Sequence, residues 1–238
     1  MASRYLQIHE AARRADVETI QRELDDGVSP NAVGQDATPL HCVCRTDRDV
    51  DNGSVDSRLA CLRLLVEAGA DIRADPRGNG WTPTAAAVFS GLPLLVTALL
   101  DAGVDVNSCD QGGWTILHWA CRLSSAEMVV LLINRGAALD RRIDAGMTPL
   151  DMALWVGQHQ NIPILLRAGV DPGIPIHPLA CREPNAYLQK VTAAGGIRAY
   201  ERNHLNALVA TFAPKFSHLL PPELVRRVVE YAFHAGDY

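Results

Sequence analysis

The side chains of this chain that are best suited to hold a calcium ion lie in one short segment. Asp47, Asp49 and Asp51 occupy alternate positions, as the first ligands of a calcium-binding loop do. Arg58, however, stands where such a loop needs a bidentate glutamate. The segment Arg45–Arg58 is therefore predicted to be a solvated loop, which could form a second contact surface, and calcium binding is a remote alternative.

A second group of metal-binding residue types, Cys42 and Cys44 beside His41, lacks the paired CxxC spacing of a zinc site. His118 and Cys121 lie three residues apart on one predicted helix, without a second pair to complete a site. The sequence also contains no glycine-rich phosphate loop, nucleophile elbow or metalloprotease helix. We therefore expect no cofactor, no metal and no enzymatic activity.

The elements that must position any functional side chain follow a repeat of 33 residues. Thr82, Thr115 and Thr148 are separated by that interval, and each lies 21 residues before a glycine that follows a Leu-Leu pair. Threonine followed by proline favours a helix start, because proline in the first turn has no amide hydrogen bond to lose. The glycine ends the second helix by adopting a left-handed conformation. This periodicity predicts a solenoid of helix pairs that bury their faces against one another.

The family is indicated by Thr38-Pro-Leu-His41, by its variants at the later threonines, and by the Leu-Leu-x-x-Gly-Ala-Asp sequences that follow them. These stretches closely resemble ankyrin repeats, over about residues 5–173. The resemblance implies an all-α solenoid of helix-turn-helix units joined by hairpin fingers. It divides the array into about five repeats: 5–35, 36–77, 78–110, 111–143 and 144–173.

Ankyrin repeats usually bind a partner protein on their concave side, with the finger tips and the inner helices. The matching positions in this chain form what we call the predicted interface row: Trp81, Trp114, Met147, Phe89, Arg45, Arg122 and Trp155. Tryptophan and arginine often anchor protein interfaces. One or two of these tryptophans could instead pack between repeats, and Trp119 is assigned to the core because the family has a framework leucine there. The resemblance therefore implies an interaction module or adaptor that binds another protein.

The repeat pattern stops before residues 174–238, which form the predicted C-terminal extension. Helices are expected from about Asn185 to Val191 and from about Ile197 to Phe212, and Ala213–Phe216 is expected to end the second. A last apolar stripe includes Leu224, Val228 and Phe233.

Two interpretations of that stripe compete. A solenoid needs an atypical end that covers its last apolar face, and a cap would turn the stripe inward. The segment Leu220-Pro-Pro-Glu-Leu224 also weakly resembles the opening helix of an F-box. That resemblance implies a substrate receptor whose stripe docks a subunit of a cullin–RING ubiquitin ligase. We favour the cap.

Composition limits the remaining classes of partner. The net charge is −5, and the acidic excess lies in the repeats, which argues against binding the phosphates of nucleic acid. No apolar run approaches the ~20 residues that span a bilayer, and the first residues lack the apolar core of a secretory signal. The six cysteines are scattered and suggest reduced thiols. We expect a monomer in the cytoplasm or nucleus, without a membrane partner.

Overall fold

The computed structural model describes residues 2–46, 53–123, 125–158, 160–171, 176–178, 180, 185–216 and 221–235. Its elements are helices joined by loops, and no strand longer than an isolated bridge occurs in these ranges. The chain divides into two compact units, Met1–Pro149 and Leu150–Tyr238. The prediction of an all-helical fold is confirmed, whereas the predicted domain boundary at 173/174 stays a prediction.

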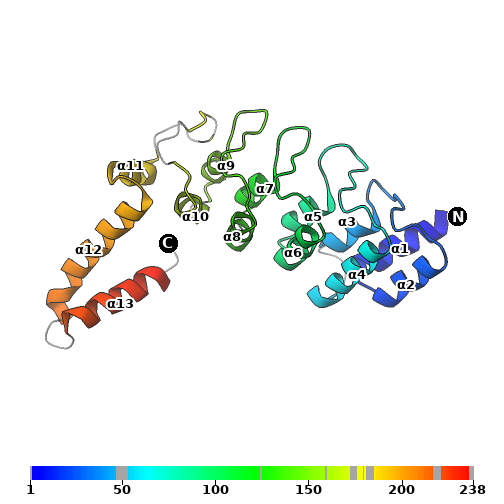
Figure 1. Ribbon diagram of the computed structural model, residues 1–238, viewed down its shortest axis with the longest axis horizontal. Coiled ribbons are helices and arrows are strands. Elements are labelled where there is room, and N and C mark those ends of the chain that lie inside the picture. Colours follow the sequence, from blue (N-terminus) through cyan, green and yellow to red (C-terminus); the bar gives the residue numbers. More distant parts are fainter. Residues whose placement is uncertain are drawn as a thin grey trace. The chain divides into compact units, whose positions relative to one another are not determined.

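Unit 1 consists of helix pairs in which the two helices of each pair contact one another (Figure 1). The first helices, α1, α3, α5 and α7, also contact one another in sequence, and so do the second helices, α2, α4, α6 and α8. The pairs are α1 (Ala2–Arg14) with α2 (Val17–Asp25), α3 (Pro39–Cys44) with α4 (Val55–Glu67), α5 (Pro83–Phe89) with α6 (Pro93–Asp101), and α7 (Ile116–Arg122) with α8 (Ala126–Asn134). Long loops, the predicted fingers, lie between the pairs.

The ends of these helices follow the expected local chemistry. The Thr82 hydroxyl accepts a hydrogen bond from the amide of Ala85, which caps the first turn of α5, and Pro83 occupies the first helical position. At the end of α6, Gly103 has φ of 100°. In this left-handed conformation, the amides of Gly103 and Val104 turn back to the carbonyls of Leu100 and Leu99. The predicted start and stop signals are therefore confirmed.

The fingers contain little regular structure but are closely connected to one another. Isolated antiparallel bridges join Gly34 to Ala37 and Cys109 to Thr115. The amide of Asp144 donates to the carbonyl of Gly112 at 2.9 Å, which links one finger to the next. Each finger therefore depends on its neighbour for position, as the solenoid prediction requires.

The core of unit 1 lies between the two rows of helices. Fully buried aliphatic side chains repeat at equivalent positions, whereas alanines fill the close approaches between first helices. The buried set includes Ile8, Leu40, Leu65, Leu99, Leu117, Leu132, Ala12, Ala87 and Ala120. Small residues at these places let neighbouring helices pack closely.

Unit 2 contains α9 (Pro149–Val156), α10 (Asn161–Arg167), α11 (Ala186–Ala193), α12 (Ile197–Phe216) and α13 (Pro222–Ala235). Helix α12 contacts α10, α11 and α13, and Arg167 forms an ion pair with Glu201 at 2.6 Å. The predicted end of α12 after Phe212 is wrong, because the helix continues to Phe216 with Pro214 inside its last turn. A proline destabilises a helix less in the last turn than in the centre, because few backbone hydrogen bonds of the helix lie beyond it.

Candidate functional interface

Buried histidines hold the fingers of unit 1 onto the first helices. The backbone amide of Thr38 donates to Nδ1 of His41 at 3.2 Å, and Nε2 of the same ring lies 2.8 Å from the carbonyl oxygen of Trp81. The neutral tautomer that satisfies both bonds carries its proton on Nε2. His118 repeats the arrangement with the amide of Thr115 and the carbonyl of Arg141. These histidines are structural, because each joins the start of its own helix to the following finger.

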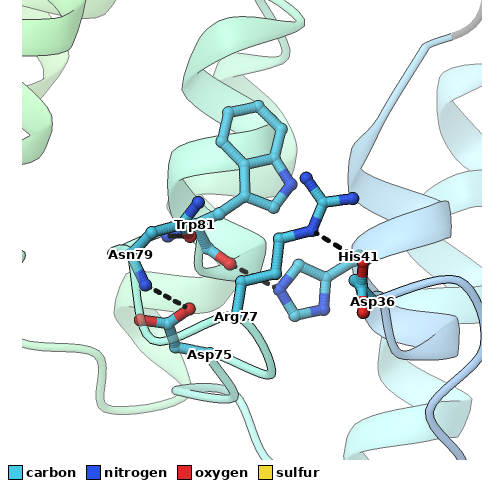
Figure 2. A network of polar contacts seen from close by, with 6 residues as sticks. All are labelled: Asp36, His41, Asp75, Arg77, Asn79 and Trp81. Atoms are coloured by element: carbon cyan, nitrogen blue, oxygen red, sulfur yellow. Dashed lines mark hydrogen bonds and ion pairs between the residues drawn. The ribbon is translucent and has the colours of Figure 1, made fainter.

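The finger that carries Trp81 is held by further polar contacts, which Figure 2 shows together. Asp75 accepts from the backbone amides of Asn79 at 3.2 Å and Gly80 at 2.7 Å, and Arg77 pairs with Asp36 at 3.6 Å. The Asp75 carboxylate stabilises the turn by accepting both amide hydrogen bonds, whereas the exposed Arg77–Asp36 ion pair contributes little to stability by itself. The backbone of Trp81 is thereby fixed on both sides, so the indole is presented from a defined position.

Two residues of the predicted interface row meet at this point. The rings of Trp81 and Phe89 pack edge to face with centroids 5.6 Å apart. Trp81 is half-buried, and Phe89 at the end of α5 is 54% exposed. An aromatic pair of this kind provides a large rigid apolar contact area.

The next helix pair carries a second cluster. Trp114 stacks on Trp119 with ring centroids 4.5 Å apart, and the guanidinium carbon of Arg122 lies 5.8 Å and 5.4 Å from the two centroids. This is cation–π geometry. The assignment of Trp119 to the core is wrong, because its side chain is only half-buried and belongs to this cluster. A large ring at a framework position cannot fit between the helices, so it turns toward the finger.

The remaining members of the row differ in exposure. Met147 is only 5% exposed, which disfavours it as a partner-binding residue, and its carbonyl accepts a hydrogen bond from the amide of Ile143. Arg45 is exposed at the end of α3. Trp155 is 51% exposed on α9 in unit 2. The structure therefore brings Trp81 and Phe89 together in unit 1 and keeps Trp155 in the other unit.

A cavity that was not predicted from the sequence lies between two successive fingers of unit 1. Its volume is about 360 Å³, and Thr84 and Ala85 of α5 form part of its wall. These residues occupy the positions of Leu40 and His41 in the preceding pair, so a leucine and an imidazole are missing there. We call this cavity the Ala85 pocket; its other lining residues used below are Arg73, Asp75, Asp105, Asp110, Trp114 and Trp119. The departure from Thr-Pro-Leu-His in the sequence was the signal for it.

The polar insert of the second pair is shorter than predicted, because its end belongs to α4. Arg58 is 1% exposed and donates to the carbonyls of Arg13, Val43 and Arg45, so it ties the ends of α1 and α3 to α4. Its inclusion in a solvated loop is wrong, because the guanidinium satisfies carbonyls that the helix ends leave open. The proposed calcium ligands at 47, 49 and 51 lie outside the described residues.

The thiols near the predicted metal-binding positions are poor ligands. Burial raises the pKa of Cys44 to about 12 and that of Cys61 to about 11, and burial also raises the pKa of Cys121. A metal needs the thiolate, which these sites disfavour. In the described ranges, no group of three or more His, Cys, Asp or Glu side chains could hold a metal ion.

The apolar stripe of α13 is divided between buried and exposed positions. Val225 is 3% exposed, whereas Leu224 and Val228 are 44% and 57% exposed. The expectation that a cap turns Leu224 and Val228 inward is therefore wrong, although α13 contacts α12. The side chain of Phe233 lies outside the described residues.

Among the helices that the structure describes, none combines the length and the apolar character needed to span a membrane.

Segments of several known proteins are similar to this chain. Human neurogenic locus notch homolog protein 4 is 33% identical over 108 residues, which make up 45% of this chain and 5% of that protein. The putative palmitoyltransferase ZDHHC13 of Danio rerio is 36% identical over 77 residues, 32% of this chain and 12% of that protein. The E3 ubiquitin-protein ligase KEG of Arabidopsis thaliana is 25% identical over 169 residues, 67% of this chain and 9% of that protein.

The chain thus spans no more than 12% of the length of these relatives. A family model described as ankyrin repeats, in three copies, matches residues 8–110 and 85–176. These ranges overlap and together cover well over half of the sequence. The chain belongs to the ankyrin-repeat family.

Proposed function

We propose that this chain is an adaptor that binds a partner protein through the surface formed by Trp81, Phe89, Trp114 and Arg122. We call these four residues the aromatic–arginine surface. The observation that carries the proposal is the exposure of Phe89, a large apolar side chain that a fixed tryptophan supports from one side. Aromatic and arginine side chains held in place by their own neighbours lose little entropy on binding.

Family membership supports the same proposal. Two of the relatives named above carry different activities in their names, a putative palmitoyltransferase and a ubiquitin-protein ligase, and this chain matches only a small fraction of the length of each relative. An interaction module explains such sharing better than a common reaction does. We propose about five repeats, formed by the helix pairs from α1 to α10, and a monomer. The described cysteines are free thiols, buried except for Cys109, and free thiols suit the cytoplasm or nucleus.

The proposal is tested by capture of a partner with the full chain and with variants of the surface. The parent chain is used for affinity purification, and bound proteins are identified by mass spectrometry. Phe89→Ala and Trp81→Ala are then expected to weaken binding of the purified partner by about 2 kcal/mol or more each. Leu94→Ala is the matched control, because Leu94 is also 54% exposed but lies on α6.

Calorimetry of the purified pair measures the loss, and circular dichroism checks that each variant keeps its helices. Phe89→Ala removes an exposed side chain, so it cannot unfold the repeats by opening the core. Full affinity in both aromatic variants, with loss in the Leu94 control, would place the interface on the other row of helices and overturn the proposal.

We propose a second function, a substrate receptor of a cullin–RING ubiquitin ligase, because α13 leaves Leu224 and Val228 exposed. A docking helix requires such an available stripe. The name of the Arabidopsis relative as a ubiquitin-protein ligase is consistent with this alternative. Val228→Asp should then abolish capture of cullin–RING subunits and leave the melting temperature unchanged.

The neighbouring Val225 provides the contrast for that experiment. Because Val225 is buried, Val225→Asp places an unpaired charge in the interior and should lower the melting temperature. Capture of ligase subunits that survives Val228→Asp, or that is never seen with the parent chain, argues against the receptor function.

A further inference from the structure

The Ala85 pocket has an excess of negative charge on its wall. Asp75, Asp105 and Asp110 line it, against one guanidinium, that of Arg73. Arg73 donates to the carbonyl of Gly103 at 3.1 Å, which occupies part of its donor capacity. Carboxylates at this density disfavour an anionic or purely apolar occupant.

The three carboxylates are fixed but not saturated. Asp75 accepts from the amides of Asn79 and Gly80, as described above, and Asp105 accepts from the amide of Asn107 at 2.9 Å. One carboxylate oxygen of Asp110 accepts hydrogen bonds from the backbone amides of Gly112 and Trp114, at 2.9 Å and 2.8 Å. A carboxylate has about four acceptor positions. Each of the three therefore retains acceptor capacity and does not need to move to use it.

A buried hydroxyl in the wall has no partner of its own. Thr84 is 1% exposed, and its Oγ1 forms no hydrogen bond with any residue that the structure describes. Such a group in a native fold calls for an explanation, because leaving it unsatisfied costs free energy. A ligand that donates a hydrogen bond in the pocket would satisfy it.

The aromatic part of the wall selects among cations. Trp114 and Trp119 both line the pocket, and this stacked pair already holds the guanidinium of Arg122 by cation–π contact. A flat guanidinium stacks on such rings and donates several hydrogen bonds in one plane, which an ammonium group does not. A volume of about 360 Å³ is within the range of small-ligand sites.

We propose that the Ala85 pocket binds the guanidinium group of an arginine side chain that the partner protein presents. The carboxylates accept from its N–H groups, Thr84 Oγ1 accepts another, and the indoles provide the stacking surface. This inference rests on the proposed function, since the pocket shares Trp114 with the aromatic–arginine surface. It adds the chemistry of the partner residue that the repeats would recognise.

The pocket is tested with N-acetyl-L-arginine methylamide, without any partner protein. In NMR spectra of the full chain, the indole N–H signals of Trp114 and Trp119 should shift saturably, with a Kd of about 1 mM, and that of Trp155 should not. The citrulline analogue has the same shape without the charge and should cause no shift. The lysine analogue should bind several-fold more weakly.

Two variants and one control place the site. Ala85→His fills the pocket with the side chain found in the preceding repeat and should abolish the shifts, whereas Asp105→Asn should weaken binding several-fold. Val130→His adds the same ring at a position that is 42% exposed on α8 and should have no effect. Melting curves confirm that each variant is folded.

The proposal is overturned if no saturable shift appears at about tenfold the expected Kd, if citrulline binds equally, or if binding survives Ala85→His. These outcomes do not affect the proposed function, because that function is tested separately, by the affinity of Phe89→Ala for the purified partner protein. Conversely, Phe89→Ala should leave binding of the free probe unchanged, because Phe89 does not line the pocket.

Discussion

The places where α5 and α7 meet their following fingers differ by two side chains. At α7, Leu117 is fully buried and His118 joins the amide of Thr115 to the carbonyl of Arg141. At α5, the same positions hold Thr84 and Ala85, and a cavity takes the place of the leucine and the imidazole. The backbones begin alike, each with a threonine that precedes the helix.

This difference shows that a finger can keep its backbone conformation even where no side chains fill the space between it and the preceding helix. The finger after α5 keeps its shape because Asp110 closes its turn and an isolated bridge joins Cys109 to Thr115. It therefore does not need a histidine beneath it. In a solenoid, each unit contacts only its neighbours, so one unfilled junction leaves the others intact.

The largest expected effect comes from copying the α5 junction onto α7. Leu117→Thr removes a fully buried aliphatic group and buries a hydroxyl, so it should lower the free energy of unfolding by about 3 kcal/mol. The reverse change, Thr84→Leu, should raise it by about 1 kcal/mol, because it covers the pocket wall with apolar surface. Urea unfolding followed by circular dichroism measures both. A stabilising Leu117→Thr would contradict the comparison.

A smaller effect is expected from exchanging the second residue of the motif. His118→Ala should cost about 2 kcal/mol, since the buried amide of Thr115 and the carbonyl of Arg141 lose their shared partner. Ala85→His should be neutral or stabilising, because space already exists for the ring. Melting temperatures of the two variants give the comparison directly. Equal destabilisation by both would show that the Ala85 pocket is too narrow for an imidazole.

The fold was largely predictable because its signals are local and repeated. Threonine, proline and glycine at fixed intervals determine where helices begin and end, and the all-helical fold followed from them. A prediction was wrong where one side chain makes distant contacts. Arg58 looked like part of a polar loop, yet it donates to carbonyls at the ends of two other helices.

The candidate site was less predictable, because position in a repeat does not determine exposure. Met147 precedes its threonine as Trp81 and Trp114 do, but its side chain is buried, whereas theirs are only half-buried. Trp119 has a framework position, but its ring is too large for the core and stacks on Trp114. The Ala85 pocket exists because Thr84 and Ala85 are smaller than the leucine and histidine at the same positions of α3 and α7. A pattern of apolar residues does not reveal such missing volume.

The smallest expected effect is a dependence of stability on pH at the junction that His41 fills. Burial lowers the pKa of His41 below its ordinary value of 6.5, and the nearby Arg77 adds to this, while the Trp81 carbonyl and Asp75 oppose it. The unfolded chain therefore takes up a proton near pH 6.5 and the folded chain does so only at lower pH.

It follows that the contribution of this residue to stability is fully present above pH 6.5 and is lost as the pH falls toward the folded-state pKa. Urea midpoints should decrease between pH 7 and pH 5, as ~6.5 is crossed. His41→Gln keeps a side chain that can bond at the third helical position but does not titrate, so its decrease should be smaller. Asp16 does not confuse the measurement, because its hydrogen bond to Thr19 lowers its pKa further below this range. Parallel pH profiles for parent and His41→Gln would mean that the buried imidazole is protonated as readily as an exposed one, and that the neutral tautomer assigned to this junction is wrong.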